Sequence, residues 1–141
     1  MYIQAITELL LSTRKSLLQT LVEVLITSLS ITDERVMTCT LSAIRKICEN
    51  STKTGELAQL LWEGLVVLQI LLKEPNCYTP LISLLRNETL GKQRRGDIFY
   101  IINCCINGFR LWDLRANHRK GFVSAGLLEA IEVRPPPPPR I

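Results

Sequence analysis

The chain has 141 residues, of which 47% are hydrophobic and 21% are charged. This length suits one domain with a hydrophobic core, and this composition is that of a globular chain and excludes a disordered one. The net charge of +4 is uneven, because ten basic and five acidic residues lie from Arg86 onward. A basic C-terminal half is compatible with nucleic acid or an acidic surface as partner, although a modest excess is more typical of a solvated face.

The periodicity of the first 50 residues predicts helices. Residues 2–12 carry an apolar stripe, and Ser12 or Thr13 is placed to cap a second helix that runs toward Ile26. Thr32 is a good N-cap for the next segment, and Asn50 is a plausible end for it. All three segments therefore indicate α-structure.

The second half of the chain continues the helical pattern. A very apolar stretch ends at Pro75, Thr79 with Pro80 starts a short helix, and Asp97 is placed to cap another one. The expected helices are 56–73, 81–86, 97–108, 111–120 and 122–133, with a polar loop at 88–96. No window alternates as a strand would, so the predicted fold class is all-α.

The chain also contains an internal similarity with a period near that of helical-repeat proteins. Residues 21–29 align with residues 65–73 at an offset of 44, and the segment 62–65 with its glycine is similar to 124–127. The stretch TLVEVLITSLSITDERVMTCTLSAIRKICEN (20–50) resembles an armadillo repeat. In this resemblance, helices one, two and three are 22–29, 33–38 and 39–50, and Gly64 precedes the first helix of the next repeat. HEAT-like arrays and other helical bundles share such leucine patterns.

The resemblance implies a right-handed α-superhelix of about two to three repeats over residues 1–133, followed by a proline-rich tail at 134–141. Each unit of such an array buries its apolar face only against its neighbours. The residues expected in the core are Leu9, Leu10, Leu21, Leu25, Leu41, Ile44, Ile47, Leu61, Leu65, Leu68 and Leu72.

Catalytic and metal-binding patterns are weak in this sequence. His118 is the single histidine, lies in a polar stretch without a nucleophile motif, and is expected at the surface. The cysteines have no CxxC spacing and sit in apolar runs, which is typical of buried structural thiols in a reducing compartment. They are Cys39, Cys48, Cys77, Cys104 and Cys105. We therefore expect no enzyme activity, no metal and no cofactor.

The location expected from the sequence is intracellular, most simply the cytoplasm. The N-terminal residues carry no basic leader, and the apolar run 60–72 is shorter than a bilayer span and contains Glu63. No membrane span is expected.

Three groups of residues are candidates for partner binding. Armadillo proteins of the importin type clamp peptide backbones with asparagines on the third helix; Asn87 and Asn107 could take this role, but Lys46 stands at that position in the clearest repeat. The basic residues are Lys92, Arg94, Arg95, Arg119 and Lys120, for which a solubilising surface is the alternative. In the tail, Pro135, Pro138 and Arg140 match an SH3 ligand, and WW domains and profilin also bind such runs; a stiff linker is the alternative.

These observations predict a non-enzymatic scaffold that binds a protein or peptide partner on one face of a helical superhelix. The alternative is a module that binds nucleic acid or an acidic surface through its basic C-terminal half.

Overall fold

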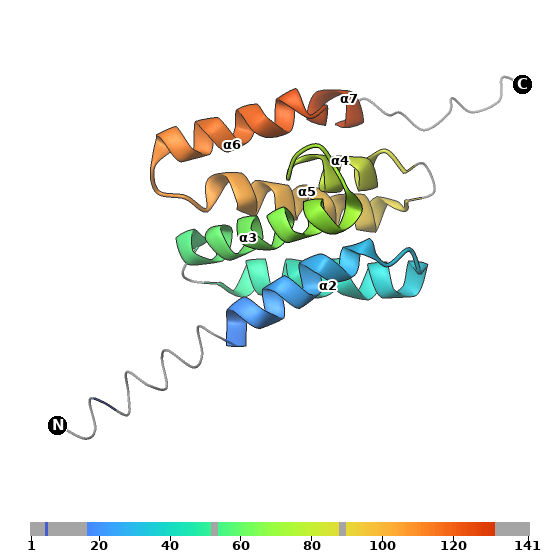
Figure 1. Cartoon of the computed structure of the whole chain (residues 1–141), viewed down its shortest axis with the longest axis horizontal. Coiled ribbons are helices and arrows are strands. Elements are labelled where there is room, and N and C mark those ends of the chain that lie inside the picture. Colours follow the sequence, from blue (N-terminus) through green and yellow to red (C-terminus); the bar gives the residue numbers. More distant parts are fainter. Residues whose placement is uncertain (1–4, 6–16, 52–53, 88–89, 132–141) are drawn as a thin grey trace, which may run out of the picture.

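The protein is all-α over the part of the chain that the structure describes. The computed structural model describes Ala5 and residues 17–51, 54–87 and 90–131, and every regular element in these ranges is a helix. After the helix of residues 17–27 follow η1 (Ser28–Ser30), α2 (Glu34–Asn50), α3 (Thr54–Leu72), α4 (Thr79–Leu85), α5 (Lys92–Asn107), α6 (Trp112–Ser124) and α7 (Leu127–Ile131), as Figure 1 shows. The predicted all-α class is confirmed over these ranges. The expectations for Leu9, Leu10 and the proline tail fall outside these ranges.

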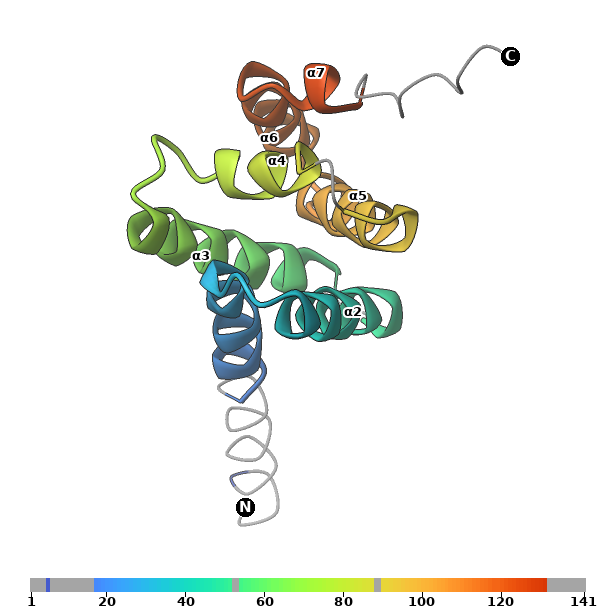
Figure 2. The same ribbon diagram turned by 90° about the vertical axis from the view of Figure 1, so that its right-hand side faces the viewer.

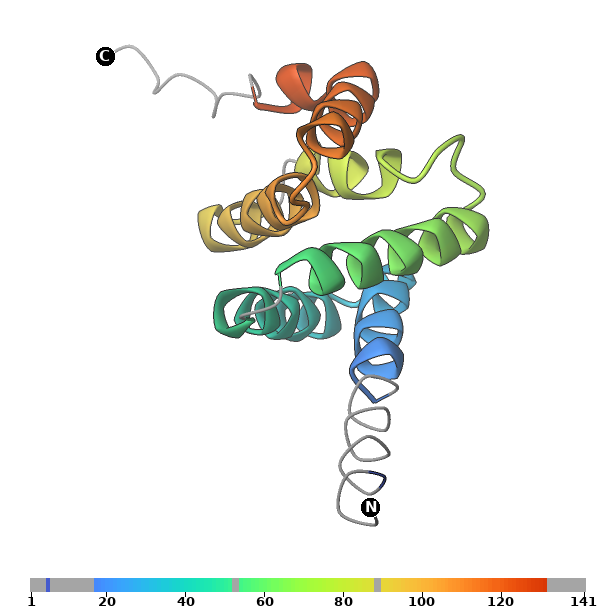
Figure 3. The same cartoon turned by 90° about the vertical axis from the view of Figure 1, so that its left-hand side faces the viewer.

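The helices pack in pairs that are distant in sequence. Helix α2 lies beside α5, and α3 packs against η1, α4 and α5. At the other end, α6 follows α5 and contacts α7, which also contacts α4 (Figure 2). The opposite view in Figure 3 shows α2 and α5 stacked on one flank, with the helix of residues 17–27 crossing α3.

Helix α2 begins one residue later than the sequence predicts. Asp33 is its N-cap, because the backbone there is extended and the carboxylate accepts hydrogen bonds from the backbone N–H groups of Arg35 (2.9 Å) and Val36 (3.2 Å). The helix then runs unbroken to Asn50, as predicted for its end. The division into separate second and third helices after Thr38 is therefore wrong: the Thr38 hydroxyl donates to the Glu34 carbonyl inside a continuous helix.

Helix α3 is continuous through Gly64, which does not mark the start of a helix. A Cβ atom at Gly64 would lie 3.0 Å from Ile26 Cβ, so the missing side chain is what allows the helix of residues 17–27 to approach α3. The helix ends at Leu72, and the positive φ of 56° at the next residue, Lys73, reverses the chain. There Glu74 N–H donates to Gln69 O (3.0 Å), as in a Schellman C-cap.

Helix α5 begins earlier than predicted, and this changes the role of Asp97. The segment 92–96, predicted as part of a polar loop, forms the first turns of α5, with Gly91 as N-cap. Asp97 is not a cap: it is buried inside the helix and bound to Arg45. The predicted helices 111–120 and 122–133 correspond to α6 and α7, but the predicted break at residue 121 is wrong, because α6 continues to Ser124. The two helices are separated at Gly126, whose φ of +107° requires glycine.

The hydrophobic core is formed mainly by leucine and isoleucine from α2, α3, α4 and α5. Of the predicted core residues, Leu41, Ile44, Leu61, Leu65 and Leu68 are fully buried, and Leu25 and Ile47 are partly buried against them. The predictions for Leu21 and Leu72 are wrong, since these side chains are 48% and 40% exposed. Both belong to long apolar helices that bury only one face.

Helix α3 is also the one described helix whose length and composition would allow it to cross a bilayer. The segment Gly55–Leu72 has a mean hydropathy of 1.4. It is longer than the run 60–72 considered in the sequence, so the argument from length does not hold for it. A core helix of a globular domain meets the same criterion, and in this fold α3 contributes Leu57, Leu61, Leu65 and Leu68 to the core.

Candidate protein-binding groove

A groove of about 440 Å³ runs between α2 and the N-terminal part of α5. Its α2 side is formed by Glu34, Thr38 and Ser42, which follow one another at a spacing of four residues and so share one face of the helix. Its α5 side is formed by Gly91, Lys92, Gln93, Arg94 and Asp97. The groove therefore offers charges of both signs, hydroxyl groups and an amide.

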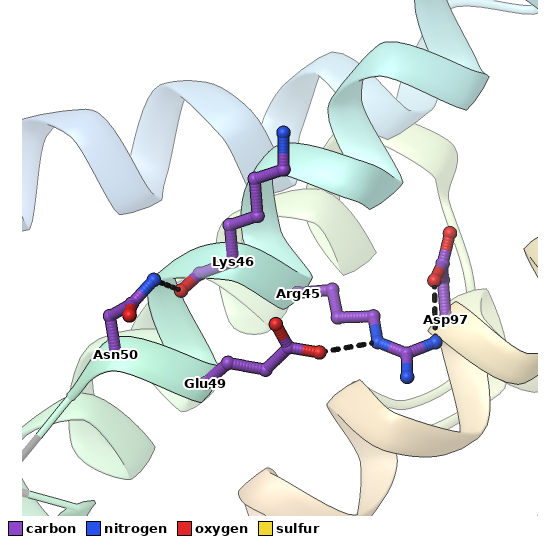
Figure 4. Close-up of polar contacts among 5 residues, drawn as sticks. All are labelled: Arg45, Lys46, Glu49, Asn50 and Asp97. Carbon is purple, nitrogen blue, oxygen red and sulfur yellow. Dashed lines mark hydrogen bonds and ion pairs between the residues drawn. The ribbon is translucent and has the colours of Figure 1, made fainter.

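Two ion pairs join the walls of this groove. Arg94 Nη1 lies 3.1 Å from Glu34 Oε1, and Arg45 Nη1 lies 2.9 Å from Asp97 Oδ1. Figure 4 shows the second pair, with Arg45 reaching from α2 to α5 and also contacting Glu49 at 2.9 Å. These contacts hold α2 and α5 together and give the groove a defined shape.

Arg45 is the charged residue with most partners in this region. Its guanidinium lies 4.9 Å from the centroid of the Tyr100 ring, in a cation–π arrangement. The hydrogen bonds to Asp97 and then Glu49 raise the pKa of Arg45, so this side chain is a permanent cation. Asp97 is the buried partner, with a side chain that is 7% exposed, and its charge is therefore compensated within the protein.

The asparagine and lysine positions predicted for peptide binding do not meet in the groove. Lys46 is exposed and points away from α5, and its carbonyl accepts a hydrogen bond from Asn50 Nδ2 (2.8 Å), as Figure 4 shows. Asn107 is exposed at the end of α5 and donates to Asn103 Oδ1. Asn87 is exposed just beyond α4.

The predicted basic residues are divided among different environments. Lys92 and Arg94 line the groove. Arg95 instead has an internal role, because its guanidinium donates to Leu85 O (2.6 Å) and Ala130 O (3.2 Å) at the C-terminal ends of α4 and α7. Arg119 and Lys120 are exposed on α6. The five residues therefore do not form one free basic surface.

His118 is buried, and its predicted surface position is wrong. It is 9% exposed and lies among aromatic rings, with centroids 4.2 Å from Trp62 and 4.9 Å from Phe109. Its Nδ1 is 3.3 Å from the Tyr78 hydroxyl. Loss of hydration lowers the pKa of His118, so the neutral imidazole is favoured as a packing residue of this aromatic cluster. The polar sequence around it gave no sign of this, because its partners lie in α3, in the loop before α4 and in the segment after α5.

The cysteines have different surroundings as well. Cys48 and Cys105 are buried, as predicted for packing residues, and burial raises the pKa of the Cys105 thiol. Cys39 is exposed, so the expectation that it packs in the core is wrong. Over the described ranges, no group of three His, Cys, Asp or Glu side chains could hold a metal ion.

Sequence reasoning missed the residues that form most of the groove. Glu34, Thr38 and Ser42 carry a detectable signal, since polar side chains at positions i, i+4 and i+8 define one face of a helix. The sequence pattern does not indicate that this face borders a groove. The groove exists only because α2 packs beside α5. No family model matches the chain, and no curated protein or solved structure matches it either.

Proposed function

We propose that this protein is an armadillo-like, non-enzymatic scaffold that binds an extended protein segment in the groove between α2 and α5. The observation that carries the proposal is the groove itself, about 440 Å³ in volume and lined by hydroxyl, amide and charged side chains of two long neighbouring helices. Such a lining suits the polar backbone of an extended peptide better than a small apolar ligand.

The order of helix packing supports a repeat arrangement. The helix of residues 17–27 packs on α3 through Ile26 and Gly64, and the Trp62 ring of α3 contacts the His118 ring of α6. In the same order, α4 contacts α7 and α2 contacts α5. Equivalent helices of successive units would stack in this manner in an array, and each unit would supply one long helix to a common groove.

The proposal is tested by selecting extended peptides from a random display library with the full chain. Lys92→Glu changes the charge of a groove residue, and Lys120→Glu makes the same change on α6. We expect selected peptides to lose about tenfold or more in affinity, about 1.4 kcal/mol, with the first variant and to bind the second unchanged. Equal effects of both variants, or no enrichment at all, would contradict the proposal.

Nucleic-acid binding is the alternative function that this experiment should be compared with. In that case, RNA or DNA oligonucleotides would bind with a steep loss of affinity at increasing salt. Arg95 is held by two backbone carbonyls and Arg94 by Glu34, so the structure gives this alternative fewer free cations than the sequence suggested.

A further inference from the structure

Two cysteines from different parts of the sequence face each other across the interface of α2 and α5. The contacts between these helices advance in the same direction along both: Glu34 meets Arg94, and Arg45 meets Asp97 and Tyr100. Figure 4 shows the Arg45 contact. One turn further along each helix from Arg45 and Tyr100 lie Cys48 and Cys104.

The two thiols interact directly. Cys48 is buried and Cys104 is half-buried, and both belong to or pack against the hydrophobic core. The interaction between the two side chains lowers the pKa of the Cys104 thiol and, together with burial, raises the pKa of Cys48. The sequence-based expectation of a buried structural thiol at Cys104 did not include this partner on α2. Cys104 has the properties of an attacking thiol, and Cys48 those of a resolving one.

We propose that Cys48 and Cys104 form a reversible disulfide that links α2 to α5 when the protein meets an oxidised low-molecular-weight disulfide such as glutathione disulfide. Such a link would fasten the two helices that form the walls of the groove. The other three cysteines do not take part.

The reaction balances as two thiol–disulfide exchanges. The Cys104 thiolate attacks one sulfur of glutathione disulfide, the S–S bond breaks, and the first glutathione leaves and takes up the proton that Cys104 has lost. Cys48 then loses its proton and attacks the Cys104 sulfur of the mixed disulfide, and the second glutathione leaves with that proton. Two protein thiols are oxidised, and one glutathione disulfide is reduced to two glutathione molecules.

The test uses the full chain, reduced and then incubated with glutathione disulfide under native conditions. After the free thiols are alkylated and the protein is digested with trypsin, mass spectrometry should detect residues 47–53 joined to residues 96–110. Because the second peptide contains both Cys104 and Cys105, the variants Cys104→Ser and Cys105→Ser identify the sulfur. We expect Cys105→Ser to form the link at the wild-type rate, and Cys104→Ser to form no link between these two peptides.

Cys39 provides the matched control, since it is an exposed cysteine on the same helix as Cys48. It should acquire a glutathione adduct without forming an internal link, and Cys39→Ser should leave the Cys48–Cys104 link unchanged. Far-UV circular dichroism establishes that each variant keeps its helices. The proposal is overturned if the folded wild-type protein forms only glutathione adducts, if Cys48 is joined to Cys105, or if the link appears only after unfolding in urea.

Discussion

Three glycines inside helices give a sharp test of how packing changes an intrinsic preference. Gly64, Gly96 and Gly121 lie within α3, α5 and α6. Helix propensity alone predicts that replacement by alanine stabilises each helix by about 1 kcal/mol. The surroundings of the three Cα atoms predict three different outcomes.

Gly121 is the position where alanine should be destabilising. A Cβ atom there would overlap the ring of Tyr78, which must then move away from its neighbours. The ring would lose its contacts with Trp62 (centroids 5.1 Å apart) and Phe122 (4.8 Å), at about 0.5–1.5 kcal/mol each, and its hydrogen bond to His118, at about 1 kcal/mol. After the gain in helix propensity is subtracted, Gly121→Ala should lower the free energy of unfolding by about 1–3 kcal/mol.

The other two glycines complete the series. At Gly96 the nearest atom to a new Cβ is Arg45 Nη1, at 3.9 Å. Gly96→Ala should therefore stabilise the protein by about 1 kcal/mol, the full difference in helix propensity. At Gly64 the Cβ would lie 3.0 Å from Ile26 Cβ and 3.1 Å from its Cγ1. We expect Gly64→Ala to be destabilising by about 0–2 kcal/mol, because overpacking offsets the gain.

The assay is urea unfolding followed by far-UV circular dichroism, with the midpoint and slope compared among the variants. Tyr78→Ala supplies the control, since removing the ring removes the clash. In that background Gly121→Ala should become stabilising by about 1 kcal/mol, and the double-mutant cycle measures the coupling. The reasoning is refuted if Gly121→Ala raises the free energy of unfolding as much as Gly96→Ala does.

Three further predictions concern single side chains. Because His118 is buried with a lowered pKa, its imidazole takes up a proton in the unfolded chain at a pH where it stays neutral in the folded protein. The free energy of unfolding should therefore fall as the pH drops below about 6.5, by at most about 1.4 kcal/mol per pH unit. The fall should level off below the pKa of His118 in the folded protein. Urea midpoints from pH 7.5 to 5 should show this loss in the wild type and less of it in His118→Phe. Lys73→Gly should stabilise the protein by about 0.5–1 kcal/mol and so raise its melting temperature, because φ is +56° there. An unchanged or lower melting temperature would contradict this. Asp97→Ala should lower the free energy of unfolding by about 1–2 kcal/mol, a limited loss because the Arg45 side chain is 37% exposed and can be hydrated; a loss that does not shrink in an Arg45→Ala background would show that the ion pair is not its cause.

The local signals in the sequence identified most helices and part of their ends. Helical periodicity located the helices around Leu41, Leu65 and Ile102, and Asn50 was recognised as a helix end. Leu61 and Leu68 were placed correctly in the core. These properties depend on residues within a few turns of one another, so a single sequence contains them.

The tertiary structure decided which of several equivalent faces each helix buries. Leu21 and Leu72 have the same local pattern as Leu61, yet they are exposed because no helix covers them among the described residues. His118 is buried in a polar stretch because Trp62 and Phe109 surround it.

The candidate groove and the thiol pair also depend on tertiary structure. Asp97 has the local pattern of a helix cap and becomes the buried partner of Arg45, 52 residues away. Cys48 meets Cys104 through the same packing of α2 on α5. The sequence by itself therefore determined the helices and a large part of the core. The groove, the aromatic cluster and the cysteine pair could be found only from the fold. They depend on contacts between residues far apart in the chain, and no periodic pattern in the sequence indicates such contacts.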